Sequence, residues 1–214
     1  MTMTTPVHLD DLISSAGALA AGGGRVILGI TGAPGAGKST VGTRIVDSLG
    51  PDKAVLVPMD GFHLANAVLL ANGLRQVKGA IETFDDAGYA KLLQRIREQK
   101  SGEIIYAPSF NRDLEEPIAG SIPVTADVPL VVTEGNYLLA EAGAWPSARE
   151  CLTESWFLDP EQDRRHHWLI TRHMDYGKSA EDARLWALGS DEDNARLIEA
   201  MAHRADRVLR VKGL

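Results

Sequence analysis

Short runs of apolar residues recur along the chain, and longer stretches with helical spacing separate them. Such runs, bounded by glycine, proline or charged residues, are typical of strands that are buried on both faces of a parallel sheet. Strands that alternate with helices form crossover units, so we expect a mostly parallel sheet with helices on both of its faces. The expected strands are 25–30, 54–58, 130–133, 154–158 and 207–211.

An amphipathic pattern is clearest over 85–100, where Leu92 and Ile96 lie on the same side. This spacing predicts a helix whose apolar side faces the sheet. An alanine-rich helix is expected at about 8–21, and it should end at the three glycines 22–24, because glycine breaks helical continuity. Further helices are expected at 40–49, 64–72, 161–174, 180–188 and 194–205.

The segment 104–124 differs from the rest of the chain because prolines interrupt it and it has no sustained periodicity. Proline lacks the backbone N–H that regular structure uses. We therefore expect this segment to be irregular and to fold over a site rather than to add to the core.

The chain has 214 residues, a mass of 23.0 kDa and a formal net charge of −7. This length suits one α/β domain with a small lid, so residues 1–214 are expected to form a single domain. Nucleic-acid binders usually carry excess positive charge, and the acidic balance argues against a nucleic-acid partner.

Cys151 is the one cysteine, which excludes an intramolecular disulfide. There is no secretory signal and no apolar run of the ~18 residues that a membrane span needs, so we expect no membrane partner and a cytoplasmic location.

The sequence GAPGAGKST, residues 32–40, follows the first apolar run and precedes a helical stretch. Its three glycines permit backbone conformations that point several N–H groups at one anion. In this pattern Lys38 reaches the β- and γ-phosphates of a nucleotide, and the Ser39 hydroxyl binds Mg²⁺. A glycine turn with a chance lysine is the alternative, but it leaves the strand before and the helix after unexplained. We therefore expect a P-loop that binds ATP and Mg²⁺ through Gly32, Ala33, Pro34, Gly35, Ala36, Gly37, Lys38, Ser39 and Thr40.

Together, the strand pattern and this loop predict a P-loop NTPase fold. The expected architecture is a three-layer α/β/α sandwich with a mostly parallel five-stranded sheet and a small helical lid. Ligands of such sheets bind at the carboxyl ends of the strands. Side chains that directly follow the apolar runs are therefore the candidates for the site.

Two of the carboxylates that follow apolar runs are candidates for the chemistry of the site. Asp60 comes after 54–58, and it either accepts a proton from a substrate hydroxyl, binds Mg²⁺ through water, or caps the helix that starts near His63. Glu134 comes after 130–133, where it binds Mg²⁺ or caps the strand end. The P-loop beside them favours the functional interpretation of both residues.

Phosphoryl transfer also needs positive charge over the transferred group. Arg165 and Arg172 are seven residues apart on one expected helix, so they share a face. They either contact phosphate or belong to a solvated helix face. Arg112, in the proline-rich segment, either meets an anion of the substrate or pairs with Glu115 or Glu116.

Histidines and tryptophans add one candidate. His63 lies three residues after Asp60, where it either contacts the substrate or makes a local cap or core contact. His166 and His167 are adjacent and are expected on the surface. The six histidines lack the spacing of a zinc site. The four tryptophans are expected to pack in the core or the lid.

Several blocks of sequence occur together with the P-loop: MDGFHLANAVLLANGL, KGAIETFD, YAPSFNR and VVTEGNYLL. In this order they resemble the phosphoribulokinase, uridine kinase and type I pantothenate kinase superfamily of P-loop small-molecule kinases. The chain is most similar to a bacterial group described as nucleoside or nucleotide kinase-like, or as proposed fructose-transport-system kinases. The resemblance covers residues 25–140 best, and as an ordered set these blocks are more specific than the P-loop alone.

The resemblance implies that Asp60 is the general base, that Lys38 and Ser39 bind ATP–Mg²⁺ and that Glu134 lies near the metal. It places Arg165 and Arg172 among the phosphate-clamping arginines of a lid at about 161–180. The segment 104–124 looks like the acceptor-binding segment, which suggests that Tyr106 and Arg112 contact the substrate. Asn136, in the EGNY block, is a further candidate, and Asn194 and the segment before Arg207 are candidates for holding the base of ATP. The sequence does not indicate the oligomeric state; the resemblance offers a homodimer as one assembly, since relatives commonly form one.

The sequence departs from particular members of the superfamily. Arg172-His173 stands where uridine kinases have Arg-Asp, and Trp168 and Leu169 stand where they have further arginines. The segment 106–112 lacks the Tyr-Ser-His of pantothenate kinases. Neither uridine nor pantothenate is therefore implied as the substrate.

The leading functional hypothesis is an ATP- and Mg²⁺-dependent kinase that phosphorylates a hydroxyl of a small polar metabolite, with a sugar or a nucleoside favoured over pantothenate. The alternatives are a pantothenate-like kinase, a regulatory P-loop NTPase without a small-molecule acceptor, and a nucleotide-binding protein without catalysis. The chain has no NKxD motif of a GTPase and no LSGGQ-like signature of a transporter ATPase. Among the kinase hypotheses, the sequence leaves the acceptor open.

Overall fold

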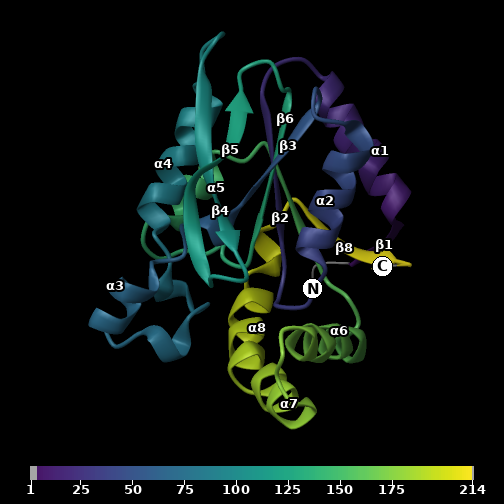
Figure 1. Cartoon of the computed structure of the whole chain (residues 1–214). Helices are drawn as coiled ribbons and strands as arrows, with labels where there is room; N and C mark the ends of the chain where they lie inside the picture. The colour runs from purple at the N-terminus through teal and green to yellow at the C-terminus, as the bar shows by residue number, and fades with distance from the viewer. Residues whose placement is uncertain (1–3, 214) are drawn as a thin grey trace.

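The computed structural model describes residues 4–213 and has three layers (Figure 1). A central sheet separates the helices α1 (Leu9–Ala21) and α2 (Lys38–Leu49) on one face from α4 (Asp86–Arg97) and α5 (Trp145–Glu150) on the other (Figure 1). The buried residues form one hydrophobic cluster on each face of the sheet. The predicted α/β/α sandwich is thus confirmed.

The sheet has six strands rather than the predicted five, and every neighbouring pair is parallel. The additional strand pairs with the last strand at the edge of the sheet. It has four residues, of which only Val7 is buried, so it carries too little apolar pattern to be recognised from sequence. In spatial order the strands are β1 (Thr5–His8), β8 (Arg207–Lys212), β7 (Glu154–Leu158), β2 (Val26–Thr31), β6 (Leu130–Gly135) and β3 (Ala54–Pro58).

The central strands β2 and β6 are buried along their whole length. Their register pairs Ile30 with Glu134, and β3 continues it by pairing Pro58 with Glu134. The ends of β2, β6 and β3 therefore lie next to one another. This register brings the P-loop, Glu134 and the residues after Pro58 to one edge of the sheet.

The expectation of an irregular segment at 104–124 is wrong. Residues in this region form an antiparallel pair of strands, β4 (Ile104–Asn111) and β5 (Glu116–Thr125), with a register irregularity between Ala107 and Ser109. Prolines are tolerated because each strand has a free edge, where a missing N–H costs no ladder hydrogen bond. Ile105, Ala107 and Val124 are buried in the core, so the hairpin also adds to it, contrary to the prediction.

The other predicted helices form within a few residues of their expected bounds, except the last. That helix begins earlier and stops at Ala200, after which the backbone tightens into a 3₁₀ turn, Ala202–Arg204. Helices α6, α7 and α8 gather at the carboxyl end of the central strands, and α3 lies at the same end (Figure 1). No helix among residues 4–213 is both long and apolar enough to cross a bilayer. The bounds are α3 Asn66–Ala71, α6 Gln162–Asp175, α7 Ala180–Leu188 and α8 Ser190–Ala200, with 3₁₀ helices Met59–Phe62, Arg75–Val77 and Ile81–Thr83.

Candidate active site

The P-loop joins β2 to α2 and contacts α6 directly. Gly35 and Gly37 have positive φ angles of 79° and 87°, a region that side chains with a Cβ rarely adopt. A Cβ on Gly35 would also lie 2.9 Å from the Arg165 carbonyl oxygen. Glycine is therefore required here both by the backbone turn and by the close approach of α6.

Lys38 begins α2 and is 9% exposed. Its ammonium donates hydrogen bonds to the carbonyl oxygens of Gly32 (2.9 Å) and Ala33 (3.0 Å). Burial, helped by the nearby Arg172 and opposed by Glu134, lowers the pKa of Lys38 to about 8. In this arrangement the loop's own carbonyl groups hold the lysine at the mouth of the loop, where a polyphosphate would bind.

Ser39 and Glu134, the two residues predicted to bind Mg²⁺, contact each other in the structure. The Ser39 hydroxyl donates a hydrogen bond to Glu134 Oε1 at 3.0 Å, and Glu134 is 6% exposed. Hydroxyl and carboxylate oxygens suit Mg²⁺, which usually completes its shell with phosphate oxygens and water. Residues 4–213 contain no cluster of three or more His, Cys, Asp or Glu that could hold a metal by itself. The pair therefore fits a Mg²⁺ that arrives with a nucleotide.

Glu134 should make the stability of the metal-free protein depend on pH. Burial, with a further contribution from Asp60, raises the pKa of Glu134 from 4.5 to about 7. Between these values the folded state binds more protons than the unfolded state, so the free energy of unfolding should fall as the pH rises. We expect urea unfolding in EDTA to show this fall between about pH 5 and about pH 7.

The matched variant is Glu134→Gln, which has no proton to lose at this position. Its free energy of unfolding should change less over the same pH range, and added Mg²⁺ should stabilise the wild type more at the upper end. Identical pH slopes in the two proteins would contradict the raised pKa of Glu134.

Asp60 lies in the 3₁₀ helix that follows β3, and Arg112 reaches it from the β4–β5 turn. Arg112 Nη2 lies 2.5 Å from Asp60 Oδ2. The alternative in which Arg112 pairs with Glu115 or Glu116 is therefore not seen. The capping alternative for Asp60 is also not seen, because its carboxylate contacts Arg112 and α3 begins only at Asn66. The structure thus joins two predicted substrate-binding residues that are far apart in sequence.

His63 makes the local contacts that were the alternative to substrate binding. Its Nδ1 lies 2.8 Å from the Asp60 carbonyl oxygen, and its ring centroid lies 4.0 Å from that of Phe84 and 4.8 Å from that of Phe110. Burial lowers its pKa, although Asp60 opposes this. A neutral ring held between two phenylalanines therefore forms one wall beside Asp60.

Arg165 and Arg172 of α6 differ in environment, although their spacing predicts a shared face. Arg165 is 1% exposed, ion-paired with Glu192 at 2.5 Å, and directed at the Pro34 carbonyl oxygen at 3.3 Å. The solvated-face interpretation is therefore wrong for Arg165. Arg172 is exposed and lines a cavity beside the P-loop.

This cavity has a volume of about 420 Å³. Two aromatic side chains, Trp168 and Tyr176, line it. Trp168 was expected to pack in the core or the lid, whereas Tyr176 was not identified from the sequence. Trp168 and Arg172 are four residues apart on one face of α6, and Tyr176 follows at the same spacing as the residue that caps the end of the helix, so this spacing could have identified them from sequence. The lining residues are Gly35, Gly37, Lys38, Ser39, Thr40, Arg112, Trp168, Arg172 and Tyr176.

Tyr106 and Asn136, the remaining predicted contacts, do not line this cavity. Tyr106 is 59% exposed on β4, between the buried Ile105 and Ala107, so its side chain leaves the opposite face of the strand. Asn136 accepts a hydrogen bond from Thr31 Oγ1 through its backbone oxygen at 3.3 Å. Asp60 and His63 do not line this cavity either, but Asp60 contacts Arg112, which does line it, and His63 contacts the Asp60 backbone.

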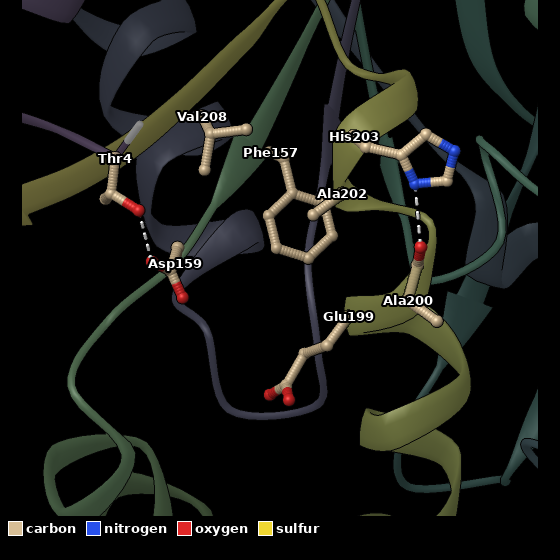
Figure 2. Close-up of a pocket in the computed structure, with 8 residues that line it drawn as sticks. All are labelled: Thr4, Phe157, Asp159, Glu199, Ala200, Ala202, His203 and Val208. Atoms are coloured by element: carbon tan, nitrogen blue, oxygen red, sulfur yellow. Dashed lines mark hydrogen bonds between the residues drawn. The ribbon is translucent and has the colours of Figure 1, made fainter. Parts of the chain in front are cut away.

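A second cavity of about 380 Å³ lies beside the P-loop on the side of β7 and α8 (Figure 2). The Glu199 carboxylate points toward it, and Glu199 Oε1 is 3.8 Å from Arg165 Nε. The segment before Arg207 contributes to this cavity, whereas Asn194 does not. The lining residues are Thr4, Phe157, Asp159, Glu199, Ala200, Ala202, His203 and Val208.

Comparisons with known proteins agree with this geometry. A protein of Escherichia coli (strain K12), the uncharacterized YggC, is 30% identical over 189 residues, which cover 86% of this chain and 77% of YggC. The crystal structure of a proposed fructose transport system kinase from Silicibacter sp. TM1040 has a TM-score of 0.83 and 34% identity, and it covers 94% of this chain and 98% of that one. A pantothenate kinase of Rhizobium etli (strain CIAT 652) is 27% identical over 69% of this chain and 47% of its own length.

The family model described as "Phosphoribulokinase / Uridine kinase family" matches residues 27–213, which include the P-loop, both strand-end carboxylates and the hairpin. The members of this family are P-loop kinases, so the likeness extends from fold to the class of reaction. The chain belongs to the phosphoribulokinase/uridine kinase family of P-loop phosphotransferases.

Proposed function

We propose that this protein is a kinase that transfers the γ-phosphoryl group of ATP to a hydroxyl of a small polar metabolite, with Mg²⁺ as cofactor. The observation that carries the proposal is the position of Asp60. Asp60 directly follows β3, whose last residue, Pro58, pairs with Glu134 of β6, and its charge raises the pKa of both Lys38 and Glu134. A carboxylate so close to the P-loop is suited to accept the proton of an attacking hydroxyl.

Each residue has a distinct role in this proposal. Lys38 and the loop N–H groups bind the β- and γ-phosphates, and Ser39 and Glu134 hold Mg²⁺, which would offset the charge of the phosphates. Asp60 accepts the hydroxyl proton while the oxygen attacks the γ-phosphorus. Arg172 stabilises the transferred group from α6, as part of a lid at about 161–180.

We place the base of ATP in the cavity of Figure 2. This cavity flanks the P-loop, and Phe157, Ala200, Ala202 and Val208 provide apolar walls for a planar ring. The arrangement would direct the triphosphate across the loop toward Lys38 and Asp60.

The acceptor is proposed to be a sugar or a nucleoside before pantothenate. Asp60, Arg112 and His63 supply polar groups that suit a polyol, and the Phe110 ring beside them suits a planar group. The Silicibacter relative is named for fructose transport, whereas the Rhizobium relative, with lower identity, is named for pantothenate. A regulatory NTPase is the second hypothesis, because a P-loop binds nucleotide both in kinases and in regulatory NTPases.

A screen of ADP formation against sugars, nucleosides and pantothenate tests the proposal. We expect one acceptor class to raise turnover at least about tenfold above the acceptor-free rate, because positioning the hydroxyl beside Asp60 removes an entropic barrier. Mass spectrometry should find one added phosphoryl group on that acceptor. The same ADP rate with every acceptor would instead favour the regulatory NTPase.

A further inference from the structure

We propose that the acceptor carries an anionic group, a carboxylate or a phosphate, a few bonds from the hydroxyl that is phosphorylated. This group pairs with Arg112 and releases Asp60 to act as the base. The inference narrows the proposed kinase function and depends on it for the transfer step, although binding of the anion can be measured without transfer.

The ion pair between Arg112 and Asp60 is accessible to a ligand. The two side chains are 46% and 28% exposed, and the pair joins the β4–β5 turn to the end of β3. Among residues 4–213, Asp60 is the one ion-pair partner of Arg112, even though Asp113, Glu115 and Glu116 are close in sequence. A single partner on a different element can be exchanged for a ligand without unfolding the hairpin.

The position of the hairpin is itself closely determined. A Cβ on Gly61 would lie 2.5 Å from the Pro108 carbonyl oxygen, so the hairpin backbone rests against the segment that carries Asp60. The Glu116 carboxylate accepts the backbone N–H of Asn66 at 3.0 Å, which ties the start of β5 to α3. The hairpin therefore holds the Arg112 backbone near Asp60, while the long side chain can change partners.

Asp60 must exchange partners to do the proposed chemistry. A general base needs a hydrogen bond to the proton that it removes. In the structure the Arg112 guanidinium donates a hydrogen bond to one oxygen of the Asp60 carboxylate, so an acceptor hydroxyl has to compete with it for that oxygen. Moving Arg112 away from Asp60 therefore favours catalysis.

A neutral acceptor gives the displaced guanidinium no counter-charge. Lys78 also lies here, since Lys78 Nζ and Arg112 Cζ each lie 5.0 Å from the centroid of the Phe110 ring. Burial lowers the pKa of Lys78, and the carboxylates of Glu115 and Glu116 oppose this, so Lys78 already has counter-charges. Arg112, in contrast, would give up Asp60, its one ion-pair partner among residues 4–213. An anionic group on the acceptor would replace Asp60 as the counter-charge of Arg112.

The acceptor anion binds Arg112, and the acceptor hydroxyl donates its hydrogen bond to Asp60. The hydroxyl oxygen forms a bond to the γ-phosphorus of ATP, the bond from that phosphorus to the bridging oxygen breaks, and ADP leaves. Asp60 receives the proton. Because Arg112 and Asp60 are in contact, the hydroxyl and the anion of the acceptor must be close together.

Matched sets of acceptors test this inference: glycerol with glycerate and glycerol 3-phosphate, and ribose with ribonate and ribose 5-phosphate. Affinity is measured by calorimetry with Mg²⁺ and a non-hydrolysable ATP analogue, and transfer by ADP formation with ATP. We expect an anionic member to bind about 10- to 100-fold more tightly than its neutral counterpart, as a charge-assisted pair should. The carboxylate and phosphate arms identify which anion the site prefers.

Arg112→Gln should reduce the affinity for the anionic member to that of the neutral one while the KM for ATP changes less than about twofold. Arg112→Lys should retain part of the preference, because it keeps the charge but not the bidentate geometry. The matched control is Arg95→Gln, which removes one arginine from the exposed side of α4, where Arg95 lies 4.0 Å from Glu103. It should leave both affinities unchanged.

Equal binding of neutral and anionic members by the wild type would overturn the inference. The inference would also be overturned if Arg112→Gln lowered the affinities for ATP and for the acceptor to the same extent, since Arg112 would then bind the ATP phosphates. Phosphorylation of neutral acceptors without an anion preference would leave the kinase proposal intact and remove this inference. Arg112-dependent anion binding without any transfer would support the anion site and contradict the kinase proposal.

Discussion

Replacing Asp60 by asparagine is expected to lower kcat by about 10²- to 10⁴-fold, because asparagine cannot accept the proton of the acceptor hydroxyl. The affinity for MgATP should change less than about twofold. The P-loop contacts of Lys38 and the hydrogen bond between Ser39 and Glu134 do not involve Asp60. Steady-state kinetics with the acceptor found by the screen, together with calorimetric titration of the ATP analogue, measure both quantities.

Asp113→Asn is the matched control for this variant. Asp113 lies next to Arg112, is exposed and makes no ion pair among residues 4–213, so its replacement removes one negative charge near the site without touching Asp60. Its kcat should equal that of the wild type. An Asp60→Asn enzyme with unchanged turnover would remove Asp60 from the role of base, and equal losses in both variants would indicate a general effect of charge.

Replacing Arg165 by alanine is expected to lower the free energy of unfolding by about 3–5 kcal/mol, the usual cost of breaking a buried ion pair on one side. Arg165 is almost completely buried and contacts Glu192 at 2.5 Å and the Pro34 carbonyl oxygen at 3.3 Å. Although burial opposes it, hydrogen bonds from Arg165 and His166 lower the pKa of Glu192, so this carboxylate is charged and would lose its main partner. Urea unfolding monitored by circular dichroism measures the change.

Arg196→Ala provides the comparison on the neighbouring helix. Arg196 pairs with Asp193 at 3.5 Å, and their side chains are 72% and 77% exposed, so its replacement should cost less than about 1 kcal/mol. If Arg165→Ala instead left the stability of the nucleotide-free protein unchanged and lowered kcat strongly, the phosphate-clamping role predicted from the family resemblance would be supported. The expected result assigns Arg165 to holding α6, α8 and the P-loop together.

Local sequence was sufficient to predict the parallel sheet, the P-loop and the position of both strand-end carboxylates. The apolar run 25–30, the glycines after it and the helix that follows are contiguous, so their signal needs no knowledge of distant residues. Asp60 and Glu134 could be placed at one edge because the carboxyl ends of parallel strands meet there. The observed register, which pairs Pro58 with Glu134, agrees with that placement.

Tertiary structure alone decided which charges meet. Arg112 and Asp60 are 52 residues apart and Arg165 and Glu192 are 27 apart, and neither separation leaves a periodic signal in the sequence. The prolines of 104–124 led us to predict an irregular segment where the structure has a hairpin. A strand with a free edge tolerates a missing N–H, and whether a strand has a free edge depends on its neighbours rather than on its own sequence. The sequence by itself was thus sufficient to identify the P-loop and to propose Asp60 as the general base. The partners of Arg112 and Arg165 depended on long-range contacts, because ion pairs form between side chains that the fold brings together.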